Sequence, residues 1–511
     1  MSQKDTPKQT IITQSDLVSE ANTFKRSTPF SDQQSLQKKI RETKTFIRSY
    51  RDFLIITVIA NAFGTFIFYS SLTYLKNIIK VSSAEYSQYD TFYSLPHIFK
   101  PVYGWITDCF YPFGYRIKSY VTLMSVIHVS LYTFIIITGP SYLGFTVCLT
   151  LIHGSDIFIN SMAEGATVIK TKLEAKLYRL EDTYISLYGG VHDTDEDEDH
   201  RKVLDEAQER MTESEKDQKN MKNFGFFTVF QRALYSTMMI LAGWITDHFN
   251  ISISFVLANF GSVFLIIYVA FFFKEKKAKR ALLGRKEITS GFKTFMKIMI
   301  APKMFFPFIL FALLTCIPYL YNASYYILQN KAGWSNTLIG VVDALYSYVN
   351  TIIVTLILNQ KKGISLTRMF LLAVIFLGAS QVLLTFAVLP DSFNFITGVV
   401  AMTLVYGFFY SSNQLSQIPL VGKISQKLPE GFESSGTNLI TGVTKMFTSI
   451  GKWLAAVELQ AMDVGNGYYE RIKSPLIYNI IYITGLSLIA PLLLMSRTAR
   501  FQKNGRKASD G

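Results

Sequence analysis

The chain has 511 residues, 49% of them apolar, with a positive mean hydropathy and a formal net charge of +14. The apolar residues are gathered in blocks of about twenty, the length that an α-helix needs to cross a bilayer core of roughly 30 Å. This pattern excludes a series of soluble domains and predicts an all-α, polytopic integral membrane protein.

The first segment, residues 1–52, is polar and rich in Ser, Thr, Gln and Lys. We expect a disordered or weakly helical cytoplasmic tail there, and no cleavable signal peptide, because the segment has no apolar block. Twelve apolar spans follow, at about 53–76, 87–108, 117–138, 142–168, 222–247, 252–273, 304–328, 335–358, 367–389, 394–418, 435–459 and 475–496.

A basic linker, residues 274–303, divides the twelve spans into two sets of six. The predicted domains are therefore an N-terminal six-helix half (53–273), a C-terminal six-helix half (304–496) and a cytoplasmic C-terminal tail (497–511). A cytoplasmic insert at 169–221 is too short and too polar to be an enzyme domain. We expect its acidic run to be solvated rather than to bind a cation; the run comprises Asp193, Asp195, Glu196, Asp197, Glu198 and Asp199.

The positive charge is distributed as the predicted topology requires. An even number of spans places both termini on one face, and the loops of that face hold most of the 51 Lys and Arg residues. Loops of the other face hold five, namely Lys76, Lys80, Lys331, Arg471 and Lys473. The positive-inside rule therefore places both termini in the cytoplasm, at the plasma membrane or an organelle membrane. It also accounts for the net charge without a nucleic-acid partner. The basic linker is either a plain orienting loop or also a contact for anionic lipid headgroups.

The three cysteines, Cys109, Cys148 and Cys316, lie in or beside apolar spans. Their positions match neither a disulfide framework nor a metal-ligand spacing. The sequence has no G-x-x-x-x-G-K-S/T phosphate-binding motif. We therefore expect no metal, no cofactor, no direct coupling to ATP and no enzymatic activity.

The junction between the second and third spans has the most distinctive sequence, K-P-V-Y-G-W-I-T-D at 100–108, with Gly114 and Arg116 shortly after it. Glycine and proline favour tight turns here, and Asp108 can pair with a base across a short loop. The letters G-W-I-T-D recur at 243–247, where the fifth span ends. Such a repeat is typical of a half built from two inverted three-helix units, which places the two copies on opposite membrane faces.

Ionisable residues within spans are costly and are functional candidates by default. Asp156, Asn160 and Glu164 are spaced by four along the fourth span, so they form one polar stripe on a helix, and Arg232 lies in the fifth span. Asp156 and Arg232 are each roughly 20 Å from the outer end of their spans, at 1.5 Å per residue. They can therefore meet near the midplane. For Asp156, the alternative is a salt bridge that only locks helices together. For Glu164, such a salt bridge is as plausible as a coupling role.

The seventh and tenth spans supply aromatic and amide side chains, among them Tyr321, Tyr325, Tyr410 and Asn413. Pro318 frees a backbone carbonyl inside the seventh span, which is tolerated where a cavity or a neighbour satisfies it. Aromatic faces suit a flat heteroaromatic ligand. Ordinary helix packing is the alternative explanation for each residue singly.

The 100–108 junction resembles the loop between helices 2 and 3 of the major facilitator superfamily. The fuller string, K-P-x-x-G-x-x-S/T-D and then P-x-G-Y/F-R/K, looks like that of the folate–biopterin transporter family. The stripe of the fourth span is similar to that family's D-x-x-x-D-x-x-x-E, with Asn160 in place of the second acid, and further matches lie at 318–340 and 429–433. The resemblance implies twelve helices in two pseudo-symmetric halves, with helices 1, 4, 7 and 10 lining a central cavity.

The same resemblance implies a secondary transporter that moves folates or pterins by alternating access. The expected substrate-binding residues are Asp156, Asn160, Arg232, Tyr321, Tyr325, Tyr410 and Asn413. The expected coupling residues, if protons drive transport, are Asp156 and Glu164. The expected gate residues are Lys100, Gly104, Asp108 and Arg116. Exchange and facilitated diffusion are alternatives to symport. A carrier of another solute (nucleoside, amino acid or organic anion) and a non-transporting receptor or scaffold are alternatives to the function itself.

In the empty protein we expect Asp156 and Arg232 to neutralise each other, because a lone charge at that depth costs at least a few kcal/mol. Substrate would then separate them. The 2-amino-4-oxo edge of a pterin would bind the carboxylate, and the carboxylates of folate would bind the guanidinium.

Overall fold

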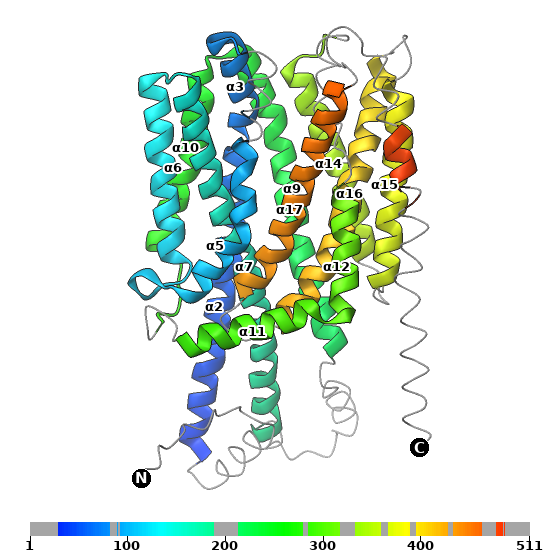
Figure 1. Cartoon of the computed structure of the whole chain (residues 1–511). Helices are drawn as coiled ribbons and strands as arrows, with labels where there is room; N and C mark the ends of the chain where they lie inside the picture. Colours follow the sequence, from blue (N-terminus) through cyan, green and yellow to red (C-terminus); the bar gives the residue numbers. More distant parts are fainter. Residues whose placement is uncertain are drawn as a thin grey trace, which may run out of the picture. The chain divides into compact units, whose positions relative to one another are not determined.

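The computed structural model describes residues 29–81, 89, 92–188, 213–278, 285–316, 333–358, 366–388, 395–427, 433–461, 477–483 and 485. The described residues are almost entirely helical (Figure 1). The principal helices before the inter-half linker are α2 (Pro29–Phe63), α3 (Phe66–Thr73), α5 (Lys100–Cys109), α6 (Lys118–Thr138), α7 (Tyr142–Tyr188), α9 (Glu213–His248) and α10 (Ile251–Phe271). The later helices are α11 (Arg285–Ile300), α12 (Pro302–Thr315), α14 (Asn336–Leu358), α15 (Leu366–Val388), α16 (Phe395–Lys427) and α17 (Glu433–Ala461).

Several helices coincide closely with the spans read from hydropathy. α6, α10, α14 and α15 each begin and end within two residues of the predicted bounds. Among the described residues, five helical segments are long and apolar enough to cross a membrane: Gln33–Thr73, Lys118–Thr138, Tyr142–Ile185, Ile251–Phe271 and Asn336–Leu358. Large apolar side chains are exposed along α6 and α10, such as Phe134, Ile137, Phe260 and Phe264. A soluble protein rarely exposes so much apolar surface, whereas a lipid-facing surface requires it.

The chain divides into two compact units, and the smaller one comprises residues 1–48 and 172–210. In its described part, α2 and α7 lie side by side. Gln33 and Gln37 donate hydrogen bonds to the Tyr184 hydroxyl at 3.1 and 2.7 Å, and Lys44 pairs with Glu181 at 2.8 Å. The two amide donors lower the pKa of the exposed Tyr184 phenol. Because α2 begins at Pro29, the last part of the 1–52 tail is helical, which is one of the two expected states.

The larger unit, residues 49–171 and 211–511, contains the helices of both halves. α9 packs along α14, and α5 packs along α17. These two pairs join the halves. A Cβ on Gly340 would lie 2.6 Å from the Met239 carbonyl oxygen, and one on Gly442 would lie 2.6 Å from the Pro101 ring. Small residues therefore bring the paired helices to backbone contact, as is common between membrane helices.

Two apolar clusters bury the interface between the halves. One joins Cys109 of α5 with Phe311 of α12 and Ile440 of α17. The other joins Ile245 of α9 with Ile339 of α14 and further residues of both halves. Packing is thus continuous across the interface near the ends of α5 and of α9.

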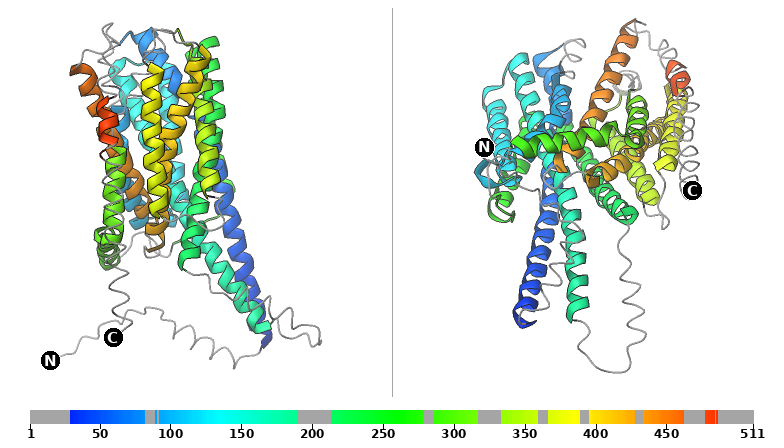
Figure 2. Two further views of the ribbon diagram at one scale, coloured as in Figure 1. Left: turned by 90° about the vertical axis from the view of Figure 1, so that its right-hand side faces the viewer. Right: turned by 60° about the horizontal axis from the view of Figure 1, so that its bottom comes forward.

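The loop between α5 and α6 makes the tight turn that its sequence predicts. Phe113 and Gly114 have positive φ values of 55° and 79°, a region that glycine adopts without strain. The Gly114 carbonyl accepts a hydrogen bond from the Ala278 N–H of the inter-half linker at 2.8 Å. Within the same linker, α11 runs across one end of the larger unit, steeply inclined to its other helices (Figures 1 and 2). The loop is therefore attached to the segment that joins the two halves.

Candidate functional site

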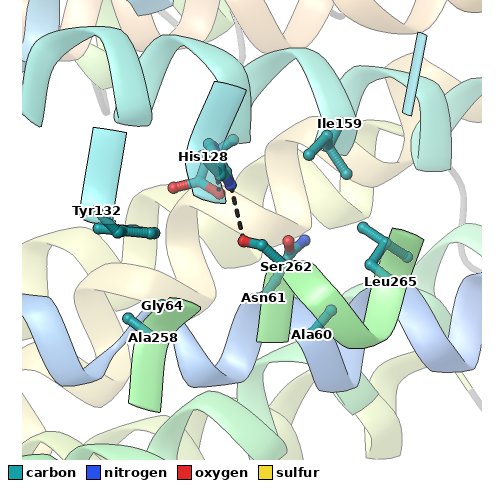
Figure 3. A pocket seen from close by; sticks show the side chains of 10 residues that line it. Ala60, Asn61, Gly64, His128, Tyr132, Ile159, Ala258, Ser262 and Leu265 are labelled. Atoms are coloured by element: carbon teal, nitrogen blue, oxygen red, sulfur yellow. Dashed lines mark hydrogen bonds and ion pairs between the residues drawn. The ribbon is translucent and has the colours of Figure 1, made fainter. Parts of the chain in front are cut away.

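Asp156 lies on α7 and faces His128 of α6. The His128 Nε2 is 3.4 Å from the Asp156 Oδ1 and 2.8 Å from the Ile152 carbonyl oxygen, and its Nδ1 is 3.1 Å from the Ser262 hydroxyl of α10. Figure 3 shows His128 and Ser262 together with Asn61 and Tyr132 around one small cavity. The cavity has a volume of about 10 Å³, room for roughly one water molecule. Asp156 therefore belongs to a polar cluster inside the N-terminal half.

Asn160, one helical turn further along α7, has different neighbours. Its side-chain oxygen accepts hydrogen bonds from the Asn61 amide of α2 at 2.8 Å and from the Gln231 amide of α9 at 3.3 Å. An amide at this position can accept from one neighbour and donate to another, whereas a carboxylate only accepts. The three amides form a polar network next to Arg232.

Arg232 of α9 lies over the ring of Tyr410, a residue of α16 in the other half. The guanidinium carbon is 4.6 Å from the ring centroid, a cation–π arrangement. The Tyr410 ring also stacks on Tyr346 of α14, with centroids 5.1 Å apart and an interplanar angle of 12°. The expected ion pair between Asp156 and Arg232 is therefore wrong for this conformation, because each side chain has another partner. The Arg232–Tyr410 contact spans the two halves.

Glu164 lies at the next position of the same stripe, and it is paired with Lys100. Nζ of Lys100 is 2.7 Å from Oε1 of Glu164, and the side chains are only 7% and 14% exposed. Oε2 of Glu164 accepts from the Thr441 hydroxyl of α17 at 3.1 Å. This cluster links α5 and α7 of the first half to α17 of the second.

Asp108 lies fully buried at the end of α5 and contacts both halves. It forms an ion pair with Arg116, as its sequence predicts. Its Oδ2 also accepts from the backbone N–H of Ser435 at 2.6 Å and from the Ser435 hydroxyl at 2.7 Å. Ser435 lies in the first turn of α17, where helical N–H groups have no partner within the helix and favour a negative charge.

Asp247, the last residue of the second G-W-I-T-D copy, makes an equivalent contact with the first turn of α14. Its Oδ2 accepts from the Thr337 N–H at 2.8 Å and from the Thr337 hydroxyl at 2.5 Å, and its Oδ1 accepts from the Asn336 amide at 2.9 Å. A Cβ on Gly243 would lie 2.5 Å from the Asn336 carbonyl oxygen, so only glycine permits this approach. Each copy of the repeat therefore holds the start of a helix of the opposite half.

The two aspartate contacts lie at opposite ends of α10. That helix begins at Ile251, four residues after Asp247. After it ends, Glu275 accepts from the N–H groups of Arg116, Ile117 and Lys118, at 3.1, 2.9 and 2.9 Å, next to Asp108. Burial raises the pKa of the Glu275 carboxyl, although these N–H groups and the Arg116 guanidinium act in the opposite direction. A 21-residue helix is roughly 30 Å long, the thickness of a bilayer core.

The remaining expected residues are placed as follows. Gly104 is buried in α5, and its carbonyl accepts from the Thr107 hydroxyl at 2.9 Å. Asn413 is partly buried on α16, one turn from Tyr410. Tyr321 and Tyr325 lie outside the described residues. The sequence reading missed the partners of the acidic stripe, namely Asn61, His128, Gln231, Ser262 and Thr441. Asn61 and His128 could have been identified as candidates from the sequence, since both are polar residues within apolar spans.

Comparisons with known proteins agree with this arrangement. Among solved structures, the nucleoside transporter NupG has a TM-score of 0.54 at 10% identity, covering 87% of this chain and 99% of NupG. The human organic anion transporter MFSD10 (TETRAN) has a TM-score of 0.54 at 12% identity, covering 88% and 99% of the two chains. At such low identity these similarities establish the fold alone. No curated protein matches the chain.

The fold is that of the major facilitator superfamily, whose family model matches residues 212–455, and the chain is a membrane transporter. A second family model, that of the BT1 family, matches residues 63–155, which include the 100–108 junction. This match supports the resemblance to the folate–biopterin transporter family within that superfamily.

Proposed function

We propose that the protein moves folates or related pterins across its membrane by alternating access. The observation that carries the mechanism is the pair of contacts at Asp108 and Asp247. Each joins the two halves at one end of the interface, so breaking one while keeping the other opens a single side. Folate and pterin are proposed from the family, together with an arginine and stacked tyrosines that suit an anionic, flat heteroaromatic solute.

In this proposal substrate binds between the halves, against the Arg232–Tyr410 contact and the neighbouring Asn160 and Asn413. Tyr321 and Tyr325 stay predicted contributors from the seventh span, and Asp156 stays a predicted ligand for the pterin edge. A pterin ring would take the place of the guanidinium on the Tyr410 face, and a substrate carboxylate would bind the released guanidinium. A bidentate pair of that kind is strong when desolvated.

The substrate class is tested by uptake into cells that express the protein, using labelled folate, biopterin, a nucleoside and an unrelated organic anion. We expect uptake of folate or biopterin. Uptake of only the nucleoside or the organic anion would make the protein a carrier of another solute. No uptake of any probe, with the protein shown to be in the membrane, would favour a receptor or scaffold.

Arg232→Gln is expected to lower folate uptake about 10- to 100-fold, because a charge-assisted hydrogen bond contributes about 1.5–3 kcal/mol. Biopterin has no carboxylate, so its uptake should be largely unchanged. Tyr410→Phe is the matched control variant for Arg232→Gln, because it keeps the aromatic ring on which the pterin would stack. Equal losses for folate and biopterin in Arg232→Gln would show that the guanidinium supports the fold rather than selecting a carboxylate.

The orientation proposed from the loop charges, with both termini in the cytoplasm, has a direct test. Protease added to intact cells should spare an epitope tag at either terminus. It should reach a tag inserted between α9 and α10, where Phe249 is exposed. A terminal tag cleaved from outside would overturn the proposed orientation.

A further inference from the structure

His128 is a buried titratable side chain that the proposed substrate site does not use. It is 3% exposed and lies in the middle of α6, an apolar helix that is otherwise suited to cross a membrane. Ionisable residues in such a position are costly and usually mark ion or proton pathways. Both ring nitrogens have partners, on α7 and on α10.

The partners determine where the ring carries its proton. The Ile152 carbonyl oxygen can only accept, so the Nε2 beside it carries a hydrogen, which also faces the Asp156 carboxylate. Nδ1 then accepts from the Ser262 hydroxyl, which can either donate or accept. A second proton can enter at Nδ1 if the Ser262 hydroxyl rotates from donor to acceptor. No other bond has to change.

Charge balance then distinguishes two states of the pair. With one exchangeable proton bound, His128 and Asp156 are together neutral, either as imidazolium and carboxylate or as imidazole and carboxylic acid. Without that proton the pair carries one negative charge, which costs at least a few kcal/mol inside a membrane. The cavity of about 10 Å³ beside Asp156 has room for roughly one water that can pass the proton on.

We propose that His128 and Asp156 form a proton-binding site within the N-terminal half, apart from the Arg232–Tyr410 contact between the halves. The proposal deepens the proposed transport function and rests on it: the bound proton would be the coupling ion. Release of the proton leaves a negative charge close to the bound substrate, so loading and conformational change become linked.

The side chains around the pair fit a proton better than a metal ion. α2 presents Asn61, α6 presents Tyr132, and α10 presents Ser262. α9 presents Tyr235, which interacts electrostatically with both Asp156 and Arg232, and α7 carries His153 one turn away. Within the described part of the chain, no group of three or more His, Cys, Asp or Glu residues is arranged to hold a metal ion.

The first test needs no substrate. Infrared difference spectra of the purified protein, recorded as the pH is raised, should contain carboxyl and imidazole bands. Asp156→Asn should remove the carboxyl band, and His128→Gln should remove the imidazole band. If neither variant changes the spectrum, the proposal is overturned, whatever the protein transports.

The second test uses proteoliposomes with labelled folate or biopterin. His128→Gln should lose uphill uptake driven by a pH gradient, yet keep exchange of substrate across the membrane without a gradient. If the wild-type protein shows no exchange, the proposed substrates are refuted. Failure of the proposed transport function can therefore be distinguished from failure of the proton-site proposal. His153→Gln is the control, since His153 pairs with His97 at 3.1 Å and stacks on Tyr93. Loss of gradient-driven uptake in His153→Gln but not in His128→Gln would place the proton site elsewhere and refute the assignment.

Discussion

Asp108→Asn is expected to open the transporter at the end where α5 meets α17, and Asp247→Asn is expected to open it at the opposite end, where α9 meets α14. Each carboxylate accepts hydrogen bonds from the first turn of a helix in the opposite half. An amide keeps the shape but loses the charge. A charged hydrogen bond contributes about 1.5–3 kcal/mol at the buried Asp108, and less at the exposed Asp247, where solvent screens it. A change of that size shifts a two-state ratio about 10- to 100-fold.

The shift is measured by the labelling rate of single cysteines in a background without Cys109, Cys148 and Cys316. Thr437→Cys, near the α17 turn that Asp108 contacts, reports the Asp108 side. Ser70→Cys reports the other side, because Ser70 is buried and bonded to Thr246 next to Asp247. Asp108→Asn should speed labelling only at position 437, and Asp247→Asn only at position 70.

The matched control is Asp52→Asn, which removes an exposed ion pair with Arg51 and should change neither labelling rate. If both gate variants shift accessibility in the same direction, the two contacts do not act as opposing gates. The second copy of the repeat would then be a packing element at the α9–α14 junction.

The two aspartates show how far sequence alone could lead. The G-W-I-T-D repeat predicted where Asp108 and Asp247 lie, at the ends of two helices, because local sequence fixes helix ends and turns. It did not predict Ser435 or Thr337 as their partners, since these residues are separated from them by long stretches of chain. The pairing with Arg116 was predictable because both residues belong to one short loop.

The acidic stripe shows a limit of a different kind. Residues four apart on an α-helix are displaced by about 40° around the axis. Three residues spaced in this way therefore face different neighbouring helices. Asp156 accordingly faces α6, Asn160 faces α2 and α9, and Glu164 faces α5 and α17. Matching Asp156 to Arg232 by depth was therefore insufficient, because depth along a span says nothing about direction around it.

Glu164→Gln is expected to destabilise the protein strongly, because it leaves the Lys100 ammonium charged in a site where that side chain is only 7% exposed. Removing one member of a buried ion pair typically costs about 3–5 kcal/mol, whereas replacing both members by apolar residues is often neutral. Lys100→Met combined with Glu164→Leu should therefore recover most of the thermal stability, measured as the unfolding midpoint in detergent. Lys44→Met is the surface control: its pair with Glu181 is 57% and 38% exposed, so the loss should be at most about 1 kcal/mol.

The stable double variant also separates the two roles predicted for Glu164. Thr441 belongs to the second half, so the Lys100–Glu164–Thr441 cluster adds to closure on the side of Asp108. If the cluster is only a clamp, the double variant keeps proton-driven uptake and labels faster at the reporter at position 437. If Glu164 carries the coupling proton, the double variant is equally stable but loses uptake driven by a pH gradient. That second outcome would move the coupling site from His128 and Asp156 to Glu164, about two turns further along α7.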